Sequence, residues 1–273
     1  MRIITYVPTD LVLKPFIDIG ITDYYFGHVP FFWKRSYSLA NSINRRYQFE
    51  GQIGPLRSIE GLLAKKWGKP LNFFLALNNH LYTQGQIEKI ISYFKGLFQT
   101  GLAGVICADI GLIIALHEQF PHLKIHVSLG APCLNSESVK FFKSMGAGRV
   151  ILDRLITIEE ARSIRDKNPG IELEMFAFQE GCPHTEGVCA HRHDQNTNCL
   201  ANINRYLSPK IDIQACKMDP LLRLHLLFNI GIDYIKIPRL CNRGATTAQM
   251  LDMYGSFFSF INLLNGFVMP HIE

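Results

Sequence analysis

Short runs rich in β-branched and aromatic residues alternate with longer amphipathic stretches along most of this 273-residue chain. The runs predict strands at residues 3–7, 24–27, 71–77, 104–108, 125–129, 149–152, 173–178, 234–237 and 257–261. Apolar residues at i, i+3 and i+4 spacing predict helices at 87–98, 111–119, 136–145, 158–165, 220–230 and 246–254. Repeated strand–helix units of this kind favour parallel strands joined by right-handed crossovers.

The number of strands favours a closed barrel. Eight or nine parallel strands fit an α/β fold of the parallel (β/α) TIM type, which runs to about 250 residues. An open nucleotide-binding sheet is disfavoured, because neither G-x-G-x-x-G nor G-x-x-x-x-G-K-[ST] occurs. No repeat, low-complexity tract or linker divides the chain, so we expect a single barrel domain over residues 1–273. Its chemistry then belongs at the carboxyl ends of the strands.

The cysteines need an explanation other than disulfides. With 48% hydrophobic and 19% charged residues the chain is typical of a globular protein. It has no run of about 18 apolar residues for a membrane span, and its start lacks the apolar core of a signal peptide. We therefore expect a cytoplasmic protein, in which the seven cysteines are reduced.

One segment, residues 179–216, interrupts the alternation after a late strand. It is polar, irregular and rich in cysteine, and a connection of this length is uncommon unless it is functional. Four thiolates from Cys182, Cys189, Cys199 and Cys216 suit iron–sulfur iron or zinc. Histidines in the same segment also allow a mixed Cys/His zinc site. The residues alone leave an iron–sulfur cluster, zinc and a metal-free site open.

The remaining cysteines have other expected roles. Cys107 and Cys133 are expected to be small buried side chains, and Cys241 is a reserve ligand that could replace one of the four. Neither H-E-x-x-H nor G-x-S-x-G occurs, which excludes two common hydrolase templates. A nucleophilic cysteine paired with histidine stays open.

A basic and aromatic run lies between the second and third expected strands. It comprises Lys34, Arg35, Tyr37, Arg45, Arg46 and Tyr47. Such a run can bind phosphates and stack bases, although a solvated amphipathic helix gives the same pattern.

Seven short motifs, in a shared order, resemble the peptidase U32 family. They are DYYFG at 23–27, LN at 77–78, DIG at 109–111, HVS at 126–128 with Asn135, GAGRV at 146–150 with DR at 153–154, EMF at 174–176, and GIDYIKI at 231–237. The resemblance covers most of the chain and points to the UbiU/UbiV type of oxygen-independent hydroxylation protein within this family.

The resemblance implies a cofactor and a reaction. In such proteins four cysteines hold a [4Fe–4S] cluster, and the matching positions here are Cys182, Cys189, Cys199 and Cys216. We therefore expect an iron–sulfur-dependent, oxygen-independent hydroxylase, or a subunit of one. The expected substrate is a small molecule or quinone precursor, with prephenate as a hydroxyl donor. The expected partner is a paralogous U32 protein or a second copy of the chain.

Five polar residues near strand ends are the expected catalytic set: Asn78, Asp109, Arg154, Glu174 and Lys236. Arg154 and Lys236 are suited to hold a carboxylate or phosphate. The structural alternative for each is a helix cap or a barrel ion pair, and Glu174 with Lys236 is the pair we expect in that case.

Two functions of other classes stay open. One is RNA modification, on tRNA or ribosomal RNA, or an RNA-binding protein with structural zinc. The other is the cysteine-dependent peptidase that the family name implies.

Overall fold

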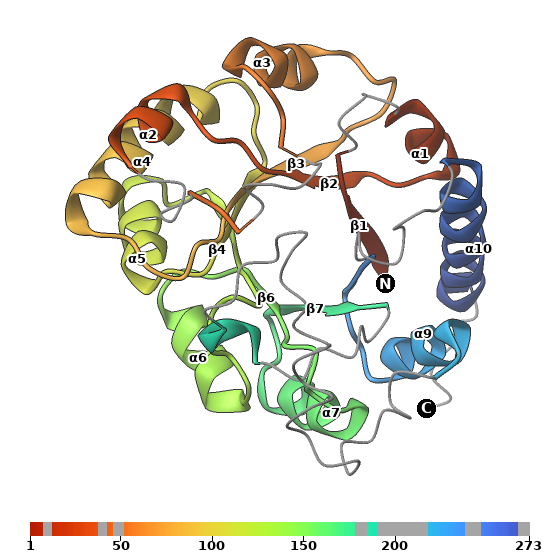
Figure 1. The fold of residues 1–273 in the computed structure, drawn as a ribbon. Coiled ribbons are helices and arrows are strands. Elements are labelled where there is room, and N and C mark those ends of the chain that lie inside the picture. The colour runs from red at the N-terminus through yellow and green to blue at the C-terminus, as the bar shows by residue number, and fades with distance from the viewer. Residues whose placement is uncertain are drawn as a thin grey trace, which may run out of the picture.

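Eight parallel strands close into a barrel in this computed structural model, with each strand hydrogen-bonded to the next in chain order and β8 to β1 (Figure 1). The structure describes residues 1–7, 13–37, 43–45, 52–177, 185–189, 218–237 and 247–266. The strands are β1 (Arg2–Tyr6), β2 (Asp23–Phe26), β3 (Asn72–Leu77), β4 (Gly104–Cys107), β5 (Lys124–Val127), β6 (Arg149–Ile151), β7 (Glu172–Phe176) and β8 (Tyr234–Lys236). The expected TIM-like barrel is confirmed.

Helices lie outside the barrel between successive strands (Figure 1). They are α1 (Leu13–Ile19), α2 (Phe31–Ser36), α3 (Leu56–Ala64), α4 (Gln84–Phe98), α5 (Ile110–Gln119), α6 (Ser136–Ser144), α7 (Ile158–Lys167), α9 (Pro220–Asn229) and α10 (Thr247–Gly266), with a short 3₁₀ turn, η2 (Glu186–Val188). None of the helices in the described ranges is long and apolar enough to cross a membrane.

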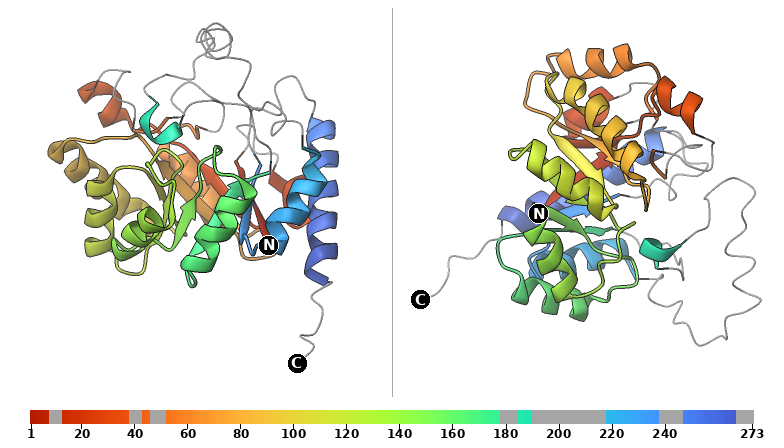
Figure 2. Two further views of the ribbon diagram at one scale, coloured as in Figure 1. Left: turned by 90° about the horizontal axis from the view of Figure 1, so that it is seen from below. Right: turned by 90° about the vertical axis from the view of Figure 1, so that its left-hand side faces the viewer.

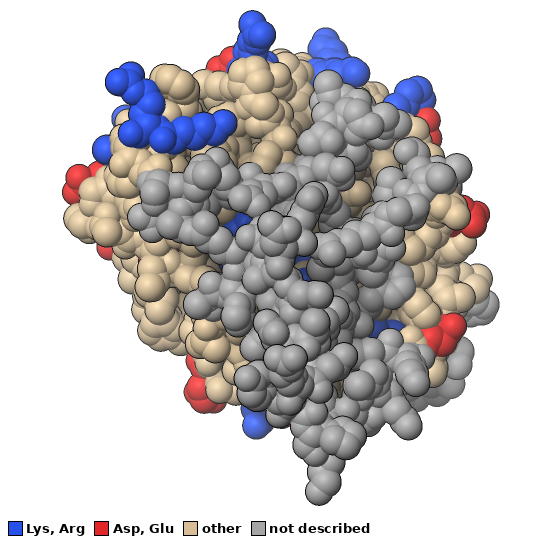
Figure 3. Space-filling view, in the orientation of Figure 1, with Lys and Arg blue, Asp and Glu red and all other residues tan. Residues whose placement is uncertain are grey.

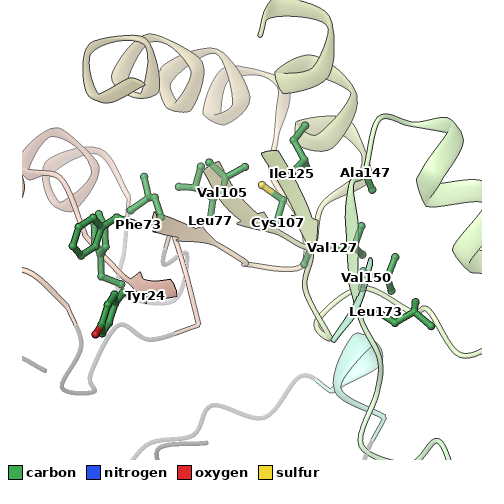
Figure 4. Close-up of a cluster of buried hydrophobic side chains, with 14 of the residues drawn as sticks. Tyr24, Phe73, Leu77, Val105, Cys107, Ile125, Val127, Ala147, Val150 and Leu173 are labelled. Carbon is green, nitrogen blue, oxygen red and sulfur yellow. The ribbon is translucent and has the colours of Figure 1, made fainter. Parts of the chain in front are cut away.

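The strands read as apolar runs because both of their faces are buried. Alternate side chains point outward and pack under the helices, including Val105, Cys107, Ile125 and Val127 (Figure 4). The other face fills the barrel interior with a smaller apolar cluster of Ile4, Tyr6, Tyr25, Phe74, Ile106, Ile151, Phe176 and Tyr234. The barrel is therefore a packed core, and open space for chemistry lies at its ends.

The expected strand at 257–261 is wrong, because these residues lie within α10. The buried side chains there are Tyr254, Phe257, Ile261 and Leu264, a three- and four-residue spacing that lines one face of a helix. Tyr254 anchors that face through a 2.6 Å hydrogen bond to Thr5 and an edge contact with Phe16. Eight strands already close the ring, so it offers no edge for a ninth.

Helix ends follow the local signals in the sequence. Thr157 and Glu160 form a capping box at the start of α7, each side chain bonding the other residue's backbone N–H. Gly146 ends the turn after α6 with a φ of +95°, which suits glycine and lets the chain enter β6 directly.

Candidate functional site at the barrel mouth

The carboxyl ends of the eight strands define one face of the barrel, which we call the mouth. Residues 185–189, from the segment that follows β7, lie over this face, and Figure 2 shows η2 in teal beside the strand ends. His80 after β3 and Asp153 after β6 hydrogen-bond to this short piece of chain, and its Gly187 lies close to the backbone that follows β5.

Glu186 is the centre of these contacts and is 5% exposed. Arg45 Nη1 donates to the Glu186 carboxylate at 2.8 Å and to its carbonyl oxygen at 3.1 Å. Arg154 Nη1 lies 3.9 Å from the other carboxylate oxygen. The Asp153 carboxylate accepts the backbone N–H of Glu186 at 3.0 Å. Two cations thus accompany the buried Glu186 carboxylate, as a buried charge requires, and the Asp153 carboxylate is buried beside them.

Cys189 is held at the mouth by its backbone. Its side chain is buried, and its carbonyl oxygen lies 3.2 Å from His80 Nε2. His80 Nδ1 in turn lies 2.7 Å from the Gly130 carbonyl oxygen. A β-carbon at Gly187 would come within 2.8 Å of the backbone of Ala131 and Pro132, so this approach needs glycine.

Asn78 and Asp109 lie at the strand ends, as expected, and both make structural bonds. Asn78 Oδ1 accepts the backbone N–H of Arg45 at 3.3 Å. Asp109 caps α5 by accepting from Leu112 at 2.7 Å, and its second oxygen accepts from Tyr82 at 3.1 Å. For Asp109 the helix-cap alternative is therefore what the structure shows.

Arg154 faces the mouth from the turn after β6. Its guanidinium lies 4.5 Å from the centre of the Phe176 ring, in addition to its approach to Glu186. These contacts leave 12% of its side chain exposed.

Glu174 and Lys236 lie deeper, inside the barrel, as an ion pair of 2.9 Å. Glu174 also accepts from Arg149 at 3.1 Å, and Arg149 reaches Glu172 at 2.9 Å. Burial lowers the pKa of Arg149, but the two carboxylates outweigh it and raise the pKa above its ordinary value. The ion-pair alternative is confirmed for Glu174 and Lys236, and the pair is separate from the mouth network.

His126 lies beside these charges on β5. Burial, with the nearby cations Arg149, Lys236 and Lys124, holds its pKa well below the ordinary value. Its ring packs on Phe74 with centroids 4.3 Å apart, and its Nδ1 is buried without a hydrogen-bond partner in the described part of the chain. A neutral imidazole is the form that this site accepts.

The structure describes three of the seven cysteines. Cys107 and Cys133 are buried thiols, as expected; burial raises the pKa of both, that of Cys133 to about 12. Cys189 is at the mouth. Cys182, Cys199, Cys216 and Cys241 lie outside the described residues. Within the described ranges no three Cys, His, Asp or Glu side chains gather as a metal site, so the four-cysteine set stays a prediction.

The basic and aromatic run is only partly described. Lys34 and Arg35 are exposed on α2, and Tyr37 ends that helix, whereas Arg45 turns inward to Glu186. Arg46 and Tyr47 lie outside the described residues.

Sequence reasoning missed His80, Glu186 and the role of Arg45. His80 follows β3 by three residues, a position that favours a mouth residue and was open to prediction. Glu186 and Arg45 are 141 positions apart, and no local pattern joins them.

Comparison with known proteins gives one family and several relatives. The model of peptidase family U32 matches residues 37–261. The "tRNA hydroxylation protein P" of Escherichia coli is 32% identical over 139 residues, which are 49% of this chain and 30% of that protein. The protein of the same name from Haemophilus influenzae is 38% identical over 107 residues, 37% of this chain and 23% of that protein. The matched region thus spans less than a third of these relatives.

Solved structures support the fold. The U32 peptidase Mk0906 superimposes with a TM-score of 0.54 at 14% identity, over 86% of this chain and 91% of that one. The structure described as "Native KDPGal structure" superimposes with a TM-score of 0.53 at 9% identity, over 97% of this chain and 97% of that one. At such identities the likeness concerns the barrel alone.

Proposed function

The chain belongs to peptidase family U32, and on that premise we propose that it takes part in an oxygen-independent hydroxylation, with an iron–sulfur cluster held at the barrel mouth. The observation that carries the proposal is Cys189. A single piece of chain, pinned by Glu186 and His80, keeps this thiol buried at the strand ends, where a barrel of this type places its chemistry.

The described part of the site fits such a cofactor. A thiolate ligand needs a dry, fixed position, and burial with backbone anchoring supplies both for Cys189. Cys182, Cys199 and Cys216 are the other proposed ligands of a [4Fe–4S] cluster. Once bound, the cluster supplies electron transfer. Arg154 and Asn78, at the same face, are the proposed groups that orient the substrate.

We propose RNA as the substrate class. Both curated relatives reported above are named for tRNA hydroxylation, which favours RNA over the small molecule expected from the sequence. The quinone precursor, the prephenate donor and a paralogous partner stay predictions.

The peptidase alternative is weakened at Cys189. His80 is a histidine that contacts this residue in the described structure, with Nε2 3.2 Å from the Cys189 carbonyl oxygen and Nδ1 2.7 Å from the Gly130 carbonyl oxygen. Within the described residues no hydrogen bond joins His80 to the Cys189 thiol, whereas a nucleophilic cysteine requires a histidine base at its sulfur.

Anaerobic purification tests the cofactor directly. We expect iron and acid-labile sulfide in near-equal amounts, with most of both lost in Cys189→Ser and retained in Cys107→Ser, the matched change at a buried thiol that points outward from β4 and packs under the helices. One equivalent of zinc with no sulfide would favour the structural-metal alternative. Peptide cleavage by a metal-free protein, abolished by Cys189→Ser, would favour the peptidase.

The reaction is tested in cells. Transfer RNA from anaerobically grown cells with and without the gene is digested to nucleosides and compared by mass spectrometry. We expect one nucleoside to gain a single oxygen atom only when the gene is present. An unchanged nucleoside profile, in cells that contain the iron-loaded protein, would contradict the RNA proposal.

A further inference from the structure

The positive charge of this chain is concentrated in one stretch. Residues 31–95 hold 10 of its 28 lysines and arginines but only 3 of its 23 acidic residues, so the rest of the chain carries slightly more acidic than basic residues. This stretch contains α2, α3 and α4. Figure 3 shows lysine and arginine atoms along the upper edge of the mouth view, over α2 and α3.

Seven of the ten cations of this stretch are directed to solvent. The exposed cations are Lys34, Arg35, Arg57, Lys65, Lys66, Lys89 and Lys95. Across the described ranges none of them forms an ion pair with a carboxylate; the exposed Lys14 and Lys140, elsewhere, each do. Unpaired cations in this number make a surface that attracts a polyanion.

Two features link the parts of this stretch, whose exposed face we call the basic flank: an aromatic contact between α2 and α4, and a pocket shared by the turns after α3 and α4. Phe32 of α2 lies 6.0 Å from Tyr93 of α4, measured between ring centres. At the opposite end of the barrel, Lys65, Lys66 and Lys69 line a pocket of about 390 Å³ that also includes Gly101, just after α4. The basic flank therefore runs from the mouth side of α2 to the amino end of β3.

Aromatic rings accompany the cations along this face. Phe31 is 74% exposed and lies 5.9 Å from Arg35. Lys89 lies 5.0 Å from the Tyr37 ring, and Lys65 lies 4.1 Å from Trp67. Cations for phosphates beside rings for bases are the combination that binds unpaired nucleotides. A lipid surface would favour a contiguous apolar patch, whereas the exposed large hydrophobic side chains of this stretch, Phe31, Leu56 and Leu81, come from three separate segments.

The mouth-side end of the basic flank adjoins the candidate site. Trp33 of α2 packs edge-on against Tyr82, with centroids 6.1 Å apart. The Tyr82 backbone N–H donates to Asp109, and its hydroxyl donates to the carbonyl of Ile43, two residues before Arg45. One layer of side chains thus separates the basic flank from the mouth network.

We propose that the basic flank is the docking surface for an unpaired RNA segment, which it leads to the mouth. The proposal rests on the proposed RNA function for its partner, but its evidence is the separate charge and aromatic pattern of α2–α4. Phosphates bind the cations of α2 and α4, and a base stacks on Phe31.

Fluorescence anisotropy with a labelled RNA hairpin, carrying an unpaired loop, tests the surface. The purified full chain is titrated at several salt concentrations, with duplex RNA of the same composition as competitor. The triple change Lys34→Gln, Arg35→Gln and Lys89→Gln is expected to weaken binding about tenfold or more, and to lower the salt slope by about two. Phe31→Ala is expected to weaken binding at least about fivefold.

A matched control removes the same charge from another face. Lys124, Arg162 and Lys167 are exposed near β5 and α7, and their triple change to Gln is expected to leave affinity within about twofold. Equal losses in both triple variants would overturn the proposal, because binding would then follow net charge alone. Binding to phosphatidylserine vesicles but not to the hairpin would overturn it in favour of a membrane partner.

The outcome is separable from that of the proposed function. Binding is measured without turnover, and iron is measured independently. If the protein binds RNA through the basic flank but contains no iron, the docking proposal stands and the cluster proposal fails. If the iron-loaded protein binds the hairpin equally well after the triple change in the basic flank, the cluster proposal stands and the docking proposal fails.

Discussion

Neutralising Glu186 by Glu186→Gln should release residues 185–189 from the mouth without unfolding the barrel. The side chain keeps its size but loses the charge that balances Arg45 and Arg154. Removing one partner of a buried ion pair costs about 3–5 kcal/mol. Arg45 keeps its bond to the Glu186 carbonyl, and its side chain is 16% exposed, so part of that cost is recovered. We expect about 2–3 kcal/mol against the docked state.

Release of the segment can be measured at Cys189, whose thiol is buried while the segment is docked. In the reduced, metal-free protein, alkylation of this thiol follows the population of the open segment. A cost of about 2–3 kcal/mol raises that population, and the alkylation rate, by about 30- to 150-fold. Mass spectrometry of the peptide that contains Cys189 measures the rate. Cys107, buried on β4 under the helices, reports global opening in the same sample and should stay unreactive.

The matched control is Glu137→Gln, which breaks an ion pair of almost the same length. Its bridge to Lys140 is 2.7 Å long, against 2.8 Å for Glu186, but both of its side chains are exposed. Exposed pairs contribute about 0–1 kcal/mol, so no change at Cys189 is expected. An unchanged Cys189 rate in folded Glu186→Gln would refute the view that this carboxylate holds the segment. A simultaneous rise at Cys107 would show unfolding instead of local release.

Three further predictions concern the barrel and the mouth. Glu174→Gln should lower the free energy of unfolding, measured in urea, by about 3–5 kcal/mol, because it leaves buried cations without their carboxylate. Adding Lys236→Met should restore part of the loss. If the losses of the two single variants simply add in the double variant, the pairing is contradicted. Because the folded protein lowers the pKa of His126, the unfolded chain binds the extra proton below about pH 6.5. Stability should therefore be complete above that pH and fall by about 1.4 kcal/mol per unit below it, a slope that His126→Gln removes and the exposed His122→Gln keeps. Gly187→Ala should speed Cys189 alkylation as Glu186→Gln does, because its methyl group meets backbone at 2.7–2.8 Å; normal protection would show that the loop can move aside.

The barrel was predictable because its information is local. Each strand is a short apolar run, and each helix repeats its apolar face every three or four residues, so a single pass along the chain finds all eight strands. The error at 257–261 has the same origin. A cluster of Phe and Ile has strand propensity, and residues 257–261 alone are too few to show a helical repeat. The repeat that indicates a helix becomes visible only over the longer range from Tyr254 to Leu264.

The site was predictable in place but not in role. Strand ends locate Asn78, Asp109 and Arg154 correctly, because a parallel barrel brings its carboxyl ends to one face. Role depends on partners that are distant in sequence: Lys236 is paired by Glu174, 62 positions away, and Arg45 by Glu186, 141 positions away. From the sequence alone, a lysine at a strand end that binds a substrate carboxylate cannot be distinguished from one that pairs with a carboxylate of the protein. The three-dimensional pairing decides, and here it assigns Lys236 to the barrel and places Arg154 at the mouth, beside Glu186.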